Sequence, residues 1–129
     1  MDNDFFNLVE SYRLVHEIKD NKLELVAPTN TMAKVSNKVL FELNDRFAKN
    51  IPSLRGLIQS TYAKIKSLTG TSEYMQIAVA MNECINIVEG ELRKNGYNEE
   101  DFYDVIDKSR QIMDSLVQQV NNFKDYNQI

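Results

Sequence analysis

The chain has little of what most catalytic and metal-binding sites need. Its 129 residues include a single cysteine, Cys84, and a single histidine, His16. One cysteine cannot form an intramolecular disulfide, and zinc sites need several Cys or His ligands. No serine or cysteine can be matched with a histidine base in a nucleophile–base set. We therefore expect no enzyme activity, no cofactor and no metal site.

Glycine and proline are also scarce, and tryptophan is absent. The four glycines stand alone at positions 56, 70, 90 and 96, so no glycine-rich phosphate-binding loop is present. No apolar stretch approaches the roughly 18 residues that would span a bilayer. The first residues, MDNDFFNLVESYR, lack the basic-then-apolar order of a secretory signal. These absences predict a soluble, cytoplasmic protein without a membrane partner.

Apolar residues recur at every third or fourth position, which predicts an all-α fold. Short connections favour antiparallel neighbours, so we expect a single domain over residues 1–129, a bundle of four to five antiparallel amphipathic helices. Gly70 and Gly96 follow two of the predicted helices, and Pro52 suits the first turn of another. The expected helices cover about 2–19, 31–49, 52–69, 72–94 and 99–125, with an extended connector over 20–30.

The helix expected over 72–94 is apolar over most of its circumference, which is typical of a helix that is central in its bundle or covered by a partner. Its core-facing seam comprises Tyr74, Ile77, Met81, Ile85, Val88 and Leu92. Further apolar residues lie off this seam, namely Met75, Val79, Ala80, Cys84 and Ile87. Because Cys84 has apolar neighbours and no base beside it, we expect a buried, unreactive thiol.

Charge is distributed unevenly along the chain. Residues 31–70 hold seven Lys or Arg and two acids, a net charge of +5, whereas residues 71–129 hold five bases and eleven acids, a net charge of −6. Residues 1–30 add a net charge of −3, which gives −4 for the whole chain. Two interpretations are open: the basic and acidic helices neutralise one another, or a basic patch faces an acidic protein or a nucleic-acid backbone.

Several residues lie off the core-facing seams. In the helix expected over 31–49 the seam comprises Met32, Val35, Val39, Leu43 and Phe47. Phe41 points almost opposite that seam, and Leu14 and Ile18 point away from the seam of the first helix. Lys34 and Lys38 lie one turn apart on one face, which Glu42 and Lys49 continue. Off-seam apolar side chains can form a contact patch, which favours a protein-binding surface or a homodimer.

We therefore expect a non-catalytic helical protein-interaction module, a small accessory or regulatory factor that docks on a larger protein machine. The alternative is a nucleic-acid-associated protein that uses the basic segment 31–70. Abundant asparagine and an excess of lysine over arginine hint at an AT-rich genome such as that of a phage or another mobile element. The predicted contact residues are Lys34, Lys38, Phe41, Lys49, Leu14 and Ile18.

Overall fold

A computed structural model of the chain describes residues 25–127, with side chains described as far as residue 122. This part contains four α-helices and no strand, which confirms the predicted all-α bundle over this range. The predicted helix 2–19, with the candidate contact residues Leu14 and Ile18, lies outside the described residues. The four helices are α3 Val26–Phe47, α4 Ser53–Leu68, α5 Tyr74–Lys94 and α6 Glu99–Asn127.

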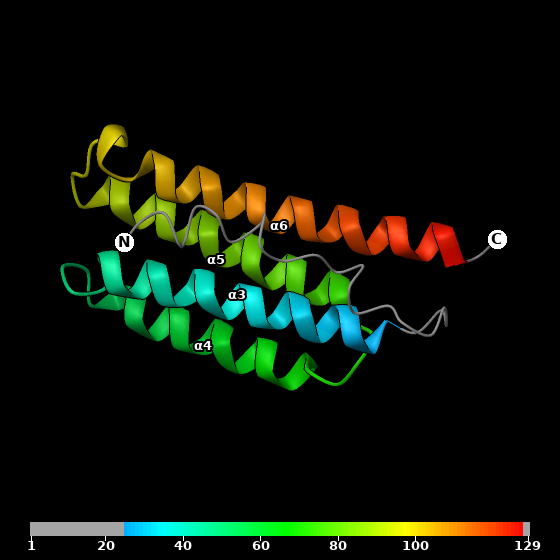
Figure 1. The fold of residues 1–129 in the computed structure, drawn as a ribbon. Coiled ribbons are helices and arrows are strands. Elements are labelled where there is room, and N and C mark those ends of the chain that lie inside the picture. Colours follow the sequence, from blue (N-terminus) through cyan, green and yellow to red (C-terminus); the bar gives the residue numbers. More distant parts are fainter. Residues whose placement is uncertain (1–24, 128–129) are drawn as a thin grey trace.

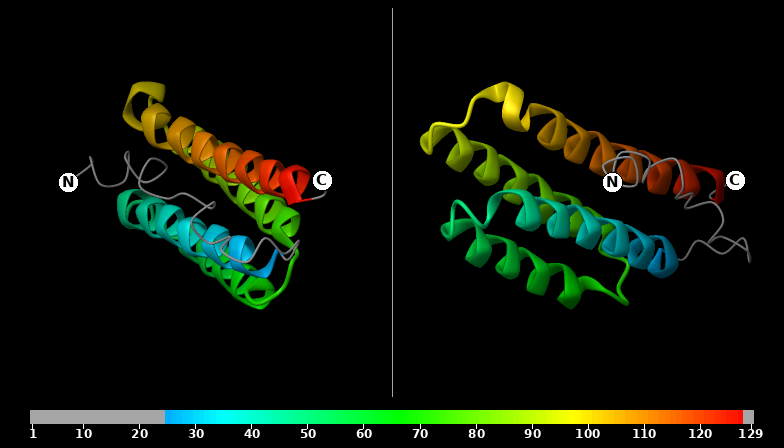
Figure 2. Two further views of the ribbon diagram at one scale, coloured as in Figure 1. Left: turned by 45° about the vertical axis from the view of Figure 1, so that its right-hand side comes forward. Right: turned by 60° about the vertical axis from the view of Figure 1, so that its left-hand side comes forward.

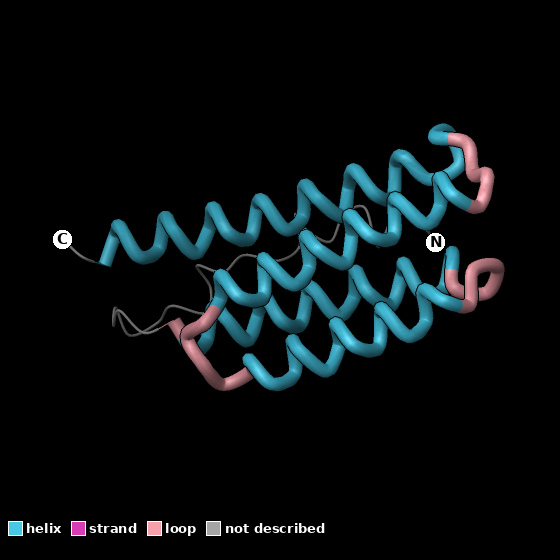
Figure 3. The backbone as a smooth tube through the Cα atoms, turned by 180° about the vertical axis from the view of Figure 1, so that it is seen from behind, coloured by secondary structure: helices cyan, strands magenta, loops and turns pink. Residues whose placement is uncertain are grey.

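The four helices run up and down in chain order, so consecutive helices are antiparallel neighbours (Figures 1 and 2). The α3–α4 and α5–α6 turns lie at one end of the bundle, and the α4–α5 turn lies at the other (Figure 3). Helices α3 and α5 each contact all three of the other helices. The basic helices α3 and α4 therefore form one side of the bundle, and the acidic helices α5 and α6 form the other.

The predicted core-facing seams of α3 and α5 are confirmed. All five seam residues of α3 are buried, and Met32, Val35, Val39 and Leu43 have no exposed surface. The six seam residues of α5 are buried as well. Each fully buried Leu, Ile or Met stabilises the fold by about 1.5–3 kcal/mol relative to an exposed position, so these stripes supply most of the driving force for packing.

The start of α3 differs from the prediction. Residues 20–30 were expected to be an extended connector, but α3 already begins at Val26, and its first turn is closed by the Thr29 N–H, which donates to the Leu25 carbonyl at 2.9 Å. Pro28 occupies the third helical position. The first four N–H groups of a helix have no intrahelical acceptor, so a proline there loses no hydrogen bond. Pro28 and Thr29 are both buried, so packing holds this turn in place.

Two glycines end helices as predicted, because their backbone adopts the left-handed conformation that other residues avoid. Gly70 has φ 88° after α4, and Gly96 has φ 82° after α5. The helix after Gly70 begins at Tyr74, two residues later than expected, and the Thr71 hydroxyl accepts a hydrogen bond from the Glu73 N–H at 3.1 Å. The Gly70 N–H donates to the Asn30 side-chain oxygen at 2.7 Å, which ties the first part of α3 to the α4–α5 turn.

Candidate interaction site

Three of the predicted contact residues lie together on the exposed side of α3. Lys34, Lys38 and Phe41 are four and three residues apart, so they form one stripe along the helix, and Phe41 is 66% exposed. Lys49 is also exposed, but it lies beyond the end of α3, in the α3–α4 turn. The structure therefore groups Phe41 with two of the three predicted lysines and places the third at the end of the bundle.

Helix α4 adds a matching stripe that the sequence analysis missed. Arg55, Tyr62 and Lys66 are exposed and follow one another at helical spacing, and Tyr62 is 44% exposed. A shallow cavity of about 210 Å³ lies between the two helices. Its walls include Phe41 and Asn44 from α3 together with Arg55 and Tyr62 from α4. The signal for this stripe was present in the spacing of residues 55, 62 and 66, but only the packing of α4 beside α3 shows that it adjoins Phe41.

The two stripes form one continuous surface. Because α3 and α4 are antiparallel and the Asn30–Gly70 hydrogen bond joins their ends, Lys34 and Lys66 each lie about one turn inward from that bond and thus at the same level. Lys38 follows on α3 beside the two aromatic rings. We call this surface the basic–aromatic face and define it by Lys34, Lys38, Phe41, Arg55, Tyr62 and Lys66.

Ion pairs do not neutralise the basic–aromatic face. The ion pair of α3 is internal and joins Arg46 to Glu42, while the remaining described pairs lie within or next to α5 and α6. Among the described side chains no ion pair joins α3 or α4 to α5 or α6, so the interpretation that basic and acidic helices neutralise one another has no direct ion pair behind it in this part of the chain. The four cations Lys34, Lys38, Arg55 and Lys66 are exposed and have no carboxylate partner among the described residues.

Charges on the acidic side of the bundle are instead paired with one another. Glu89 of α5 binds Arg110 of α6 and also accepts a hydrogen bond from Arg93 at 2.9 Å. The hydrogen bond from Arg110 is the main cause that lowers the pKa of the Glu89 carboxyl below its ordinary value, and Arg93 adds to it. Arg93 also contacts Glu99 at 2.6 Å across the α5–α6 turn. These contacts join α5 to α6, whereas Glu83 of α5 and several acids of α6 have no ion-pair partner among the described residues.

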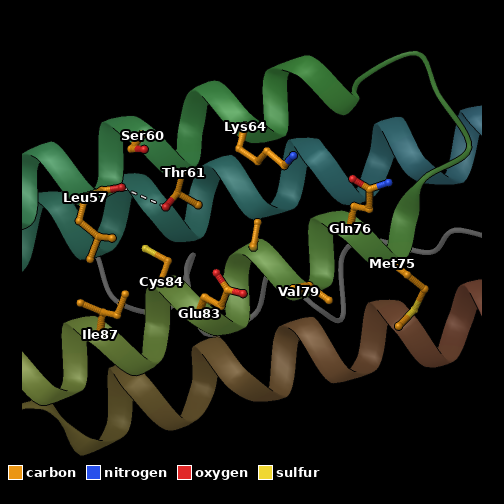
Figure 4. A pocket seen from close by; sticks show the side chains of 11 residues that line it. Leu57, Ser60, Thr61, Lys64, Met75, Gln76, Val79, Glu83, Cys84 and Ile87 are labelled. Carbon is orange, nitrogen blue, oxygen red and sulfur yellow. Dashed lines mark hydrogen bonds between the residues drawn. The ribbon is translucent and has the colours of Figure 1, made fainter.

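A second surface lies on the opposite flank of α4, where α4 packs beside α5. A cavity of about 590 Å³ runs between them, with apolar walls that include Leu57, Met75, Val79 and Ile87 (Figure 4). Met75 is 47%, Val79 51% and Ile87 50% exposed, so the off-seam apolar residues of α5 remain half uncovered in this part of the chain. We call this surface the α4–α5 groove.

Cys84 lies at the bottom of the groove and does not form a reactive site. Its side chain is buried, at 1% exposure, and burial raises the pKa of the thiol, which outweighs the lowering effect of a hydrogen bond with the Thr61 hydroxyl. The thiolate is therefore disfavoured at neutral pH, and the predicted buried position is confirmed. The Thr61 hydroxyl itself donates to the Leu57 carbonyl at 3.0 Å (Figure 4).

The described residues contain no group of three or more His, Cys, Asp or Glu side chains arranged to hold a metal ion. None of the helices between residues 25 and 127 combines the length and the apolar character that a bilayer crossing requires. Comparison with known proteins finds no matching family model, no matching curated protein and no matching solved structure.

Proposed function

We propose that the chain is a non-catalytic protein-interaction module, a small accessory or regulatory factor that docks on a larger protein through the basic–aromatic face. The partner presents an acidic segment that carries apolar side chains. One observation carries the proposal: across two helices, four cations without a carboxylate partner in the described chain share one face with two exposed aromatic rings, and Arg55 lines the same shallow cavity as both rings.

The two kinds of side chain would contribute differently. Aromatic rings anchor protein interfaces because they bury a large area at little cost in side-chain entropy. The shallow cavity between Phe41 and Tyr62 can receive an apolar side chain of the partner. Lys34, Lys38 and Arg55 would steer an acidic partner and fix its orientation, since complementary charge acts mainly on the association rate and on specificity.

A nucleic-acid ligand is the second candidate function. Aromatic rings between cations can stack on the bases of a single strand while the cations contact phosphates, and Phe41 and Tyr62 have such neighbours. The net charge of −4 argues against this alternative, because the acidic helices α5 and α6 repel a long phosphate backbone that extends past the face. A short acidic protein segment avoids that repulsion, so we favour a protein partner.

The test compares capture of cellular proteins by variants of the immobilised full-length chain. In lysate from the native host, we expect a protein that the wild type retains and that both Phe41→Asp and the double variant Lys34→Glu/Lys38→Glu lose. Tyr103→Asp is the matched control, because Tyr103 is 52% exposed on α6, outside the face. Circular dichroism checks that all variants stay helical.

Capture is quantified by mass spectrometry, and binding of a labelled oligothymidine and of a single-stranded RNA is measured in parallel. Absence of any protein with the predicted pattern of loss would contradict the proposal. Oligonucleotide binding that falls with salt and disappears in Phe41→Asp would instead establish the nucleic-acid alternative.

A further inference from the structure

The α4–α5 groove carries opposite charges on its two sides. Two charged side chains line the groove, Lys64 from α4 and Glu83 from α5. The boundary between the basic and acidic parts of the sequence falls in the turn that joins these two helices. The groove is therefore largely apolar, with one cation on its α4 side and one acid on its α5 side.

Lys64 and Glu83 lie at nearly the same level along the groove. Thr61 of α4 reaches Cys84 of α5, and Lys64 is one turn further along α4 while Glu83 is the neighbour of Cys84. Both side chains line the groove from opposite sides (Figure 4). Among the described ion pairs none joins Lys64 to Glu83, so each is available to a charge from outside.

We propose that the α4–α5 groove is a homodimer interface and that its occupant is a second copy of this chain. In a two-fold interface, residue i contacts residue j and residue j contacts residue i. A two-fold axis that runs parallel to the helices places α4 of each copy over α5 of the other. Lys64 of each copy then meets Glu83 of the other copy, which forms two equivalent ion pairs.

The opposite orientation is disfavoured by charge. An axis perpendicular to the helices places α4 over α4 and α5 over α5, which brings like charges together. In the proposed orientation the half-exposed side chains of Met75, Val79 and Ile87 are covered from both copies, so one dimer buries six of them. A second copy of the groove thus supplies both the apolar side chains that cover the first groove and the opposite charges that pair with Lys64 and Glu83.

Dimerisation through the groove is compatible with the proposed function and does not depend on it. Arg55 and Lys64 are nine residues apart, which at about 100° per residue puts them on opposite flanks of α4. The basic–aromatic face therefore remains exposed in the dimer. The assembly presents two copies of that face to partners.

The first test measures the oligomeric state of the full chain by sedimentation equilibrium, from about 1 μM to about 1 mM at low salt. We expect a monomer–dimer equilibrium in the wild type. Val79→Lys puts a charge in the middle of the apolar strip, so we expect its dimer dissociation constant to rise at least about tenfold. Tyr103→Lys is the matched control, with a side chain of nearly equal exposure on α6, and we expect it to dimerise like the wild type.

The second test reverses the charges. Lys64→Glu and Glu83→Lys each turn two attractive contacts into repulsive ones, so we expect each single variant to weaken the dimer about tenfold. The double variant Lys64→Glu/Glu83→Lys restores the attraction and should dimerise like the wild type. Each of four results would overturn the proposal. The wild type could stay monomeric at all concentrations, or Val79→Lys could dimerise as tightly as the wild type. The double variant could dimerise no more tightly than the single variants, or Lys64→Glu could dimerise more tightly than the wild type.

Discussion

Two isoleucines on α5 allow the packing of the bundle to be tested with identical substitutions. Ile85 has no exposed surface, whereas Ile87, two residues further along the same helix, is 50% exposed in the α4–α5 groove. Replacement by alanine removes three carbon atoms from either side chain, which corresponds to about 2.4 kcal/mol of transfer free energy when all three are buried. At Ile85 the cavity left behind adds to this, so we expect Ile85→Ala to lower the free energy of unfolding by about 2–5 kcal/mol.

At Ile87 about half of the transfer term applies, roughly 1.2 kcal/mol, and the higher helix propensity of alanine offsets part of it. We therefore expect Ile87→Ala to cost less than about 1 kcal/mol. The measurement is urea denaturation followed by circular dichroism at about 1 μM, where a weak dimer is dissociated. If the two variants lost equal stability, α5 would be rotated relative to the arrangement described, and the assignment of its core-facing seam would be wrong.

Two further predictions concern a turn and an ion pair. Gly96→Ala should lower the free energy of unfolding by about 1 kcal/mol, because the φ of 82° at this position strains any residue with a Cβ. Gly90→Ala should instead raise the free energy of unfolding by up to about 1 kcal/mol, because Gly90 is mid-helix and nothing lies within 4 Å of the added carbon. Denaturation midpoints that shift in the same direction for both variants would contradict the assigned turn. For Glu89 the folded-state pKa is lowered, so its contribution to stability is present above its ordinary pKa and is lost as the pH falls through the folded value. We expect the free energy of unfolding of the wild type to fall more steeply between about pH 5 and pH 3 than that of Glu89→Gln. The control Glu100→Gln should keep the wild-type dependence of stability on pH. Equal pH dependence for the wild type and Glu89→Gln would show that Arg110 does not hold this carboxylate.

The helical framework could be predicted from the sequence because one physical rule dominates it. Apolar side chains at a spacing of three or four residues must face one direction, and in this chain the stripes of α3 and α5 are nearly uninterrupted. Gly70 and Gly96 end their helices for a reason that is equally local, namely the left-handed backbone that each adopts. The exposure of Phe41 followed from the same periodicity, because a residue opposite a buried stripe has no core to enter.

The features that could not be predicted depend on which helix packs beside which. Pro28 signals a break when it is considered alone, but within the first turn of α3 it is compatible with the helix, and tertiary packing decides the outcome. One of the two interpretations of the charge pattern, neutralisation of basic by acidic helices, rests on net charge per segment. Ion pairs, however, require side chains to face one another, and Lys34 and Lys38 lie on the outer flank of α3. Tyr62 could not be assigned to a site until α4 was placed beside α3.

The charge boundary in the sequence gives the two surfaces different kinds of partner. Where α4 lies beside α3, both helices are basic, so a second copy brought against the basic–aromatic face would meet charge of the same sign. The proposed partner of that face is therefore a different, acidic molecule. Where α4 lies beside α5, the surface holds Lys64 and Glu83 at one level, and a two-fold rotation about the groove brings each against its opposite. A surface with one sign of charge selects a foreign partner, whereas a surface with both signs can select its own copy, and α4 contributes to each from opposite flanks.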